Sequence, residues 1–149
     1  MKSYSKKILN SLDHDIFKII SDTSDDLKIE TYIVGGFVRD LIIDKSVKKD
    51  IDIMCTGSGI DLAKAIQKKI NPKTKVNIFK RYGTAMINFK GFQIEFVGSR
   101  KESYSEDSRN PSIETGDFMD DMLRRDFTIN TLAIRLNNKN FGELVDTFD

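Results

Sequence analysis

Cysteine, histidine and tryptophan are scarce in this chain of 149 residues, which contains one, one and none of them. The lone Cys55 excludes an intrachain disulfide and a zinc site built from several cysteines. Because His14 is the only histidine, the sequence also disfavours a site of several histidines or a His-based catalytic triad. Any bound metal would therefore be held by carboxylates, which favours Mg²⁺, Mn²⁺ or Ca²⁺.

Long apolar runs and an excess of either charge are also missing. No run approaches the roughly 20 apolar residues of a membrane span, and the first ten residues lack the apolar segment of a signal peptide. We therefore expect a cytoplasmic protein with no membrane partner. Lys and Arg total 24 against 23 Asp and Glu, which excludes a broadly basic surface but not a local basic groove. With 39% hydrophobic residues, the chain is expected to fold as one domain.

The hydrophobic pattern predicts helices and strands in alternation. Helices are expected at residues 4–20, 37–43, 60–70 and 122–134, with the polar run 21–26 ending the first. Strands are expected at residues 31–34, 49–54, 75–79, 84–89, 92–97 and 143–146, and a long loop at 98–121. This order predicts an α/β or α+β fold with a mixed central sheet flanked by helices.

Asp50 and Asp52 are the strongest local feature. Alternate residues of a strand share a face, so Ile51 and Ile53 would enter the core while both carboxylates point outward, roughly 6–7 Å apart. Such a pair can hold one divalent ion or bridge two, and two-metal phosphoryl transfer needs ions about 3.5–4 Å apart. Glu95, on the polar face of a later strand, offers a third acid. The alternative is an ordinary strand whose acids are only solvated.

Gly35 and Gly36 connect an expected strand to an expected helix. Glycines let a phosphate approach the backbone closely, and Arg39 follows in the first helical turn, where it could hold that phosphate. A plain strand-to-helix turn is the alternative. The glycine pair gains weight because the acidic strand follows about 15 residues later.

A third group of polar residues lies in the last expected helix. Arg124 and Arg125 stand in its first turn, where positive charge opposes the helix dipole and needs an anionic partner. Asp126 and Asn130 are four residues apart and share one helix face. The group could meet the phosphates and sugar of a nucleotide, or it could be a structural cluster of ion pairs.

Four segments together resemble the N-terminal catalytic head domain of class II tRNA nucleotidyltransferases (CCA-adding enzymes) and bacterial poly(A) polymerases. They are YIVGGFVRD, KDIDIM, IEFVGSRKESY and RRDFTINTLAI, at residues 32–40, 49–54, 94–104 and 124–134. The resemblance implies a polymerase-β-like nucleotidyltransferase fold with a mixed sheet of about five strands. It also implies a head domain over residues 1–149, with an N-terminal helix and linker at 1–28 and a catalytic core at 29–149.

The resemblance further implies transfer of CMP or AMP from CTP or ATP to the tRNA 3′ end, with two Mg²⁺ or Mn²⁺ ions. Asp50 and Asp52 would be catalytic metal ligands and Glu95 the third catalytic acid. The residues expected to bind the nucleotide are Gly35, Gly36, Arg39, Arg124, Arg125, Asp126 and Asn130.

Members of this family carry neck, body and tail segments after the head, and these select the base and bind tRNA. We therefore expect a truncated chain, a split-gene product or a free-standing head, which would need those segments in trans for base selection and tRNA binding. The alternatives within the enzyme class are a poly(A) polymerase or an enzyme adding only C or only A. A non-catalytic nucleotide- or RNA-binding scaffold is an alternative of another class, and a small toxin-type nucleotidyltransferase is a fourth.

Overall fold

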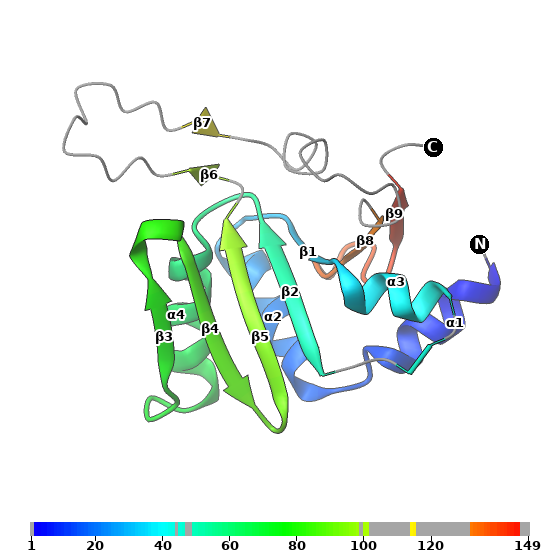
Figure 1. Cartoon of the computed structure of the whole chain (residues 1–149), viewed down its shortest axis with the longest axis horizontal. Coiled ribbons are helices and arrows are strands. Elements are labelled where there is room, and N and C mark those ends of the chain that lie inside the picture. Colours follow the sequence, from blue (N-terminus) through cyan, green and yellow to red (C-terminus); the bar gives the residue numbers. More distant parts are fainter. Residues whose placement is uncertain are drawn as a thin grey trace.

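A mixed seven-stranded sheet forms the centre of the structure (Figure 1). The computed structural model of the chain describes residues 2–43, 45–46, 49–98, 100–101, 114–115 and 132–146. The strands of the sheet are β1 (Thr31–Val34), β2 (Asp50–Cys55), β3 (Val76–Phe79), β4 (Thr84–Phe89), β5 (Phe92–Gly98), β8 (Leu132–Arg135) and β9 (Leu144–Asp146). Their order is β3-β4-β5-β2-β1-β8-β9, and β2 and β5 are the parallel pair among antiparallel neighbours. The predicted α/β class is confirmed, with more strands than the five expected.

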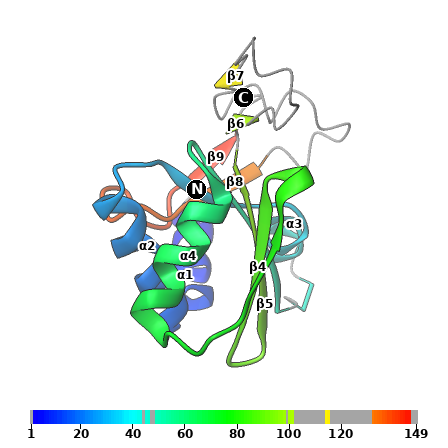
Figure 2. The same ribbon diagram turned by 90° about the vertical axis from the view of Figure 1, so that its left-hand side faces the viewer.

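The helices lie mainly on one face of this sheet (Figure 2). They are α1 (Lys2–Ser11), α2 (Asp15–Asp26), α3 (Gly36–Ile42) and α4 (Gly59–Ile70), with a short 3₁₀ turn η1 (Lys80–Tyr82). Helix α4 packs on β3, β4 and β5, and α3 packs against β1, β2 and β8. No described helix combines the length and the apolar character that crossing a bilayer requires.

The buried apolar side chains form one main core between the sheet and the helices. Helices α1 and α2 contribute to this core together with the inward residues of β2, β4 and β5. A smaller cluster on the opposite face joins Tyr32, Val34, Met54 and Ala133. Strand β1 is buried along its whole length, with Ile33 in the main core and Tyr32 and Val34 in the smaller cluster.

Glycine allows α4 to begin directly against β5. A Cβ placed on Gly59 would lie 2.7 Å from the carbonyl oxygen of Phe96, closer than any side chain can approach. Ser58 caps the helix, since its hydroxyl accepts a hydrogen bond of 3.1 Å from the backbone N–H of Asp61. Helix α4 therefore lies close enough to the sheet to bury Leu62 and Ile66.

The prediction of one helix over residues 4–20 that ends at the polar run 21–26 is wrong. The helix is interrupted at residues 12–14, and the polar run 21–26 belongs to the second helix, α2. Thr23 and Ser24 are compatible with a helix because their hydroxyls donate to the carbonyl oxygens of Ile19 and Ile20, four residues earlier.

The predicted helix over residues 122–134 is wrong at its C-terminal end, where β8 starts at Leu132. Residues 122–131 lie outside the described part of the chain. Within the expected loop 98–121, β6 (Arg100–Lys101) and β7 (Glu114–Thr115) form a two-stranded antiparallel ladder.

Candidate active site

Asp50 and Asp52 point away from the main core, as the alternation of β2 predicts. Both residues are exposed, whereas Ile51 and Ile53 between and beyond them are buried. Strand β2 lies between β1 and β5, so the backbone that carries the two acids is held on both sides. The strand thus presents two carboxylates on one face at a fixed spacing.

Glu95 joins this pair from the neighbouring strand. In the parallel pairing of β2 and β5 its Cα lies opposite that of Asp52, and paired residues of adjacent strands point to the same face. Burial raises the pKa of the Glu95 carboxyl above its ordinary value of 4.5, and the negative charge of Asp52 raises it further. The pairing places like charges side by side, an arrangement that a bound cation would stabilise.

Gly35 brings the backbone directly against Asp52. Its φ of +79° and ψ of −147° lie in a region that is essentially restricted to glycine. A Cβ at this position would lie 3.1 Å from Oδ2 of Asp52. The turn between β1 and α3 therefore packs on a predicted catalytic carboxylate, and only glycine fits there.

Gly36, the second glycine of the turn, lies close to the side chain of Arg39. A Cβ on Gly36 would lie 3.3 Å from Nη2 of Arg39, so the guanidinium lies beside the glycine turn. The Nε of Arg39 donates a 3.1 Å hydrogen bond to Oδ1 of Asp40, whose side chain is 10% exposed against 43% for Arg39. Sequence reasoning missed Asp40, although its place directly after Arg39 was a signal that it could orient this arginine.

The geometry thus joins an acidic group and a basic group through one turn. Asp52 contacts the turn at its first glycine, and Arg39 contacts it at its second. An arginine beside a glycine turn suits a phosphate, and outward carboxylates suit a hard divalent cation. Such a site can bind a phosphorylated ligand and a cation next to each other.

Comparisons with known proteins agree with this reading. Residues 31–149 match the Poly A polymerase head domain. The chain belongs to that family. The predicted resemblance to tRNA nucleotidyltransferases and poly(A) polymerases is therefore confirmed.

The similar proteins are tRNA nucleotidyltransferases. The A-adding tRNA nucleotidyltransferase of Geobacter sulfurreducens is 37% identical over 130 residues, which cover 87% of this chain and 14% of that protein. The CCA-adding enzyme of Lactobacillus helveticus is 34% identical over 132 residues, or 87% and 30%. A solved CCA-adding enzyme in complex with CTP superposes with a TM-score of 0.76 at 35% identity, covering 97% of this chain and 33% of that one. A tRNA nucleotidyltransferase complexed with a primer tRNA and an incoming ATP analog gives a TM-score of 0.69 at 31% identity, covering 85% and 34%. This chain thus spans 14–34% of the length of these relatives.

Not all of the predicted site of this head domain lies in the described ranges. Arg124, Arg125, Asp126 and Asn130 fall outside them, so their proximity to the carboxylates stays a prediction. Across those ranges, no three Asp, Glu, His or Cys side chains are arranged to hold a metal ion. Within them, Asp50 and Asp52 are a pair with Glu95 as their neighbour, and the metal site also stays a prediction.

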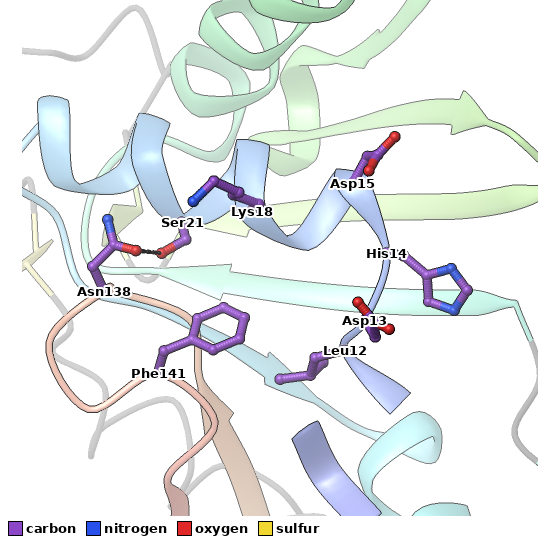
Figure 3. Close-up of a pocket in the computed structure, with 8 residues that line it drawn as sticks. All are labelled: Leu12, Asp13, His14, Asp15, Lys18, Ser21, Asn138 and Phe141. Carbon is purple, nitrogen blue, oxygen red and sulfur yellow. Dashed lines mark hydrogen bonds between the residues drawn. The ribbon is translucent and has the colours of Figure 1, made fainter. Parts of the chain in front are cut away.

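A cavity of about 320 Å³ lies elsewhere on the head domain, between α2 and the β8–β9 connection (Figure 3). Its lining residues are Leu12, Asp13, His14, Asp15, Lys18, Ser21, Asn138 and Phe141. None of the predicted site residues lines it. Ser21 and Asn138 are hydrogen-bonded to each other across one end, so the cavity is in part closed by a structural contact.

Proposed function

We propose that the chain is the catalytic head of an RNA 3′-end nucleotidyltransferase that transfers CMP or AMP from CTP or ATP to the 3′ end of tRNA. The observation that carries this proposal is the close approach of the glycine turn to the acidic strand, where a Cβ on Gly35 would lie 3.1 Å from Oδ2 of Asp52. The names of the curated relatives support the substrate class. Solved relatives in complex with CTP and with ATP support the two nucleotides.

The reaction replaces a phosphoanhydride bond of the nucleotide with a phosphodiester bond at the α-phosphorus. The 3′-hydroxyl oxygen of the RNA forms the new bond, the bond to the bridging oxygen of pyrophosphate breaks, and the hydroxyl proton leaves to solvent. In this scheme Arg39 stabilises negative charge on the triphosphate, and Asp40 orients Arg39. The turn at Gly35 and Gly36 lets the phosphates approach the backbone.

A divalent cation such as Mg²⁺ fits the acids of this site. Asp50 and Asp52 would hold it, because both are exposed carboxylates on one face and Glu95 lies opposite Asp52 on the neighbouring strand. When bound, two such ions would lower the pKa of the attacking hydroxyl and neutralise charge on the leaving oxygens. Mn²⁺ would serve the same carboxylate ligands.

An enzyme that adds only A is the second candidate. Two relatives at 37% identity, from Geobacter sulfurreducens and Aquifex aeolicus, are A-adding tRNA nucleotidyltransferases. A CCA-adding enzyme bound to CTP is 35% identical over nearly the whole chain. The two candidates are distinguished by measuring incorporation of CMP from CTP and of AMP from ATP.

The test is nucleotide incorporation. The chain is incubated with Mg²⁺, labelled ATP or CTP, and a tRNA lacking its terminal CCA, with and without EDTA. We expect incorporation that EDTA and the double variant Asp50→Asn/Asp52→Asn abolish, while Asp13→Asn, an exposed acid on the helical side, retains it. If the chain incorporates nothing but binds ATP in the presence of Mg²⁺ by calorimetry, it is a head that needs further segments. Failure of both assays would contradict the proposal and favour a non-catalytic scaffold.

A further inference from the structure

Positive charge is concentrated in one continuous part of this nearly neutral chain. Residues 62–94 contain seven lysines and one arginine and no acidic residue. The remaining 116 residues therefore hold all 23 acids and have a formal net charge of −7. Such an asymmetry within one chain is typical of a protein that binds a polyanion at its basic part.

These basic residues gather at one edge of the sheet. Strand β3 is the outermost strand, and α4 packs against it (Figure 1). Two of the eight already have acidic partners, since Lys69 pairs with Asp26 at 2.6 Å and Lys90 pairs with Asp15 at 3.2 Å. The other six are exposed and form no ion pair with any residue that the structure describes. We call them the basic edge: Lys64, Lys68, Lys73, Lys75, Lys80 and Arg81.

Hydrogen bonds fix the connection from α4 to β3, which carries part of the basic edge. Nε2 of Gln67 on α4 donates to the carbonyl oxygens of Pro72 and Thr74, on either side of Lys73. Oδ1 of Asn71 accepts a hydrogen bond of 2.9 Å from the backbone N–H of Lys73. The backbone of this connection is therefore held in place against the end of α4.

The lysines of α4 face the same edge. At 3.6 residues per turn, Lys64 lies about 60° around the helix from Gln67, which bonds the β3 connection. It lies about 140° from Lys69, which bonds α2. Lys68 follows Lys64 by four residues and shares its face. The helix thus directs its unpaired lysines away from α2 and towards β3.

The cations also flank both ends of β3. Lys73 and Lys75 precede the strand, and Lys80 and Arg81 follow it in η1. Helix α4 has 12 residues and is about 18 Å long. The basic edge therefore presents positive charge along a surface of about this length.

The composition of the basic edge favours a nucleic acid over a protein. Lysine is depleted at the cores of protein–protein interfaces, whereas protein–nucleic acid interfaces are much more positively charged. Double-stranded DNA carries about one phosphate charge per 1.7 Å of its axis, so a duplex segment of about 18 Å offers about ten phosphates. That number is sufficient for all six cations of the edge.

The aromatic residues near the edge favour a duplex over a single strand. Proteins that bind single strands stack successive bases on open aromatic rings. The strongly exposed rings here, Phe79 and Tyr82, both lie at one end of the edge. The guanidinium of Arg81 lies over the Tyr82 ring, 5.9 Å from its centroid. The edge is therefore better suited to phosphates than to unstacked bases.

We propose that the basic edge binds the phosphate backbone of a nucleic-acid duplex without reading its sequence. The site is separate from the candidate active site, because β4 and β5 lie between β3 and the strand that carries Asp50 and Asp52. Helical RNA is the occupant, a choice that rests on the proposed function, whereas the contact with phosphates does not.

The test measures duplex binding by the full chain in EDTA, so that no metal-dependent step contributes. A labelled, blunt RNA duplex of about two helical turns carries phosphates on its 3′ ends, so it cannot accept a nucleotide. Its affinity is measured by fluorescence anisotropy at several salt concentrations. Contacts with four to six phosphates predict a slope of about −4 to −5 for the logarithm of affinity against the logarithm of salt.

The variant Lys68→Gln/Lys73→Gln/Lys75→Gln removes three of these contacts. We expect it to weaken binding about a hundredfold or more at about 0.1 M salt, and to make the slope less steep by about 3. The matched control is Lys6→Gln/Lys18→Gln/Lys139→Gln, with the same change in net charge at exposed lysines of α1, α2 and the β8–β9 connection. It should keep the slope, because salt screens charges beyond about 10 Å.

Mg²⁺–ATP affinity by calorimetry and the melting temperature should stay unchanged in both triple variants. The proposal is overturned if both variants lose duplex affinity equally, or if the unmodified chain binds no duplex at low salt. Tighter binding of the single strand or of a DNA duplex would overturn helical RNA as the occupant, and tighter binding of polyglutamate would assign the edge to an acidic protein. Duplex binding at this edge without any ATP binding would support the proposal while contradicting the proposed function.

Discussion

Gly35 is the residue at which backbone conformation and candidate chemistry constrain each other most directly. We predict that Gly35→Ala destabilises the fold by roughly 1–3 kcal/mol, because its dihedral angles are restricted to glycine. The new methyl group would also displace Oδ2 of Asp52, which lies 3.1 Å from it. We therefore expect Mg²⁺–ATP affinity, measured by calorimetry, to fall about tenfold or more, as when a charged contact is lost.

The matched control is Gly83→Ala. Gly83 also has a positive φ, +66°, but a Cβ there meets nothing within 4 Å. This variant should lose about 1–2 kcal/mol of unfolding free energy in urea and keep its nucleotide affinity. Equal affinity losses in both variants would assign the effect to general destabilisation and remove Gly35 from the site.

The charge interaction between Asp52 and Glu95 can be measured through the pKa of Glu95, with no assay of enzyme activity. The charge of Asp52 raises the pKa of Glu95, so Asp52→Asn should lower that pKa. Burial is the larger cause, so the pKa should remain above its ordinary value of 4.5. Asp50→Asn should change it less, because Asp50 pairs with Gln93 and not with Glu95. The measurement is an NMR titration of the Glu95 carboxyl carbon, and an unchanged pKa in Asp52→Asn would contradict the pairing.

At the scale of elements, strands with one exposed face were predictable and strands buried on both faces were partly ambiguous. The alternation in β2 and β5 identified their outward acids correctly, since a period of two residues distinguishes the faces. Strand β8 has a buried apolar residue on each side, with Ile134 in the main core and Ala133 in the opposite cluster. A short run that is apolar all round fits a buried helix equally well, so the prediction of a helix through residue 134 was wrong.

The break between α1 and α2 could not be predicted for a related reason. Ile8, Leu12 and Ile16 keep helical spacing across it and are all buried on the same side. The spacing of the apolar residues therefore continues across residues 12–14, where the helix is interrupted. The parts of the candidate site that lie in short sequence motifs, around Gly35 and around Asp52, could be predicted from the sequence. The pairing of Asp52 with Glu95 depends on which strands become neighbours, and hydrophobic patterns do not specify strand order.

A polar contact between elements gives a prediction for pH. Asp25 on α2 accepts hydrogen bonds of 2.9 Å and 2.7 Å from the side-chain amides of Asn137 and Asn138 after β8. The amide of Asn137 lowers the pKa of Asp25 below its ordinary value of 3.8, and Asn138 adds to this effect. A carboxyl with a lowered pKa in the folded state stabilises the fold above its unfolded pKa, and this stabilisation is lost as the pH falls through the folded pKa.

Asp25→Asn should accordingly reduce the free energy of unfolding at pH 7 by about 1 kcal/mol or less, because the carboxylate is largely solvated. The difference from the unmodified chain should shrink between pH 4 and pH 2. Urea unfolding at pH 7, 4 and 2 measures it. A difference that is the same at all three pH values would show that the contact of Asp25 with the two amides does not depend on its charge.

On the scale of the whole molecule, residues 1–28 and the sheet share one core. Phe17 on α2 is fully buried, with its ring centroid 6.2 Å from that of Phe37 on α3 and 5.9 Å from that of Phe92 on β5. It thus packs against the helix that carries Arg39 and against the strand that carries Glu95. The N-terminal helices therefore support both sides of the candidate site from the opposite face of the sheet.

We predict that Phe17→Ala lowers the free energy of unfolding by about 3–5 kcal/mol, since it opens a cavity in this core. A whole domain is stable by only about 5–15 kcal/mol, so a fragment of residues 29–149, which lacks five buried core side chains, should not unfold cooperatively or bind Mg²⁺–ATP. Those side chains are Ile8, Leu12, Ile16, Phe17 and Ile20.

As a control, Leu27→Ala at a side chain that is 44% exposed should cost about 1 kcal/mol or less. Calorimetric melting and nucleotide titration of the three proteins measure this. A fragment that melts cooperatively and binds nucleotide would instead make residues 29–149 a self-sufficient catalytic core, with the N-terminal helices as an addition to it.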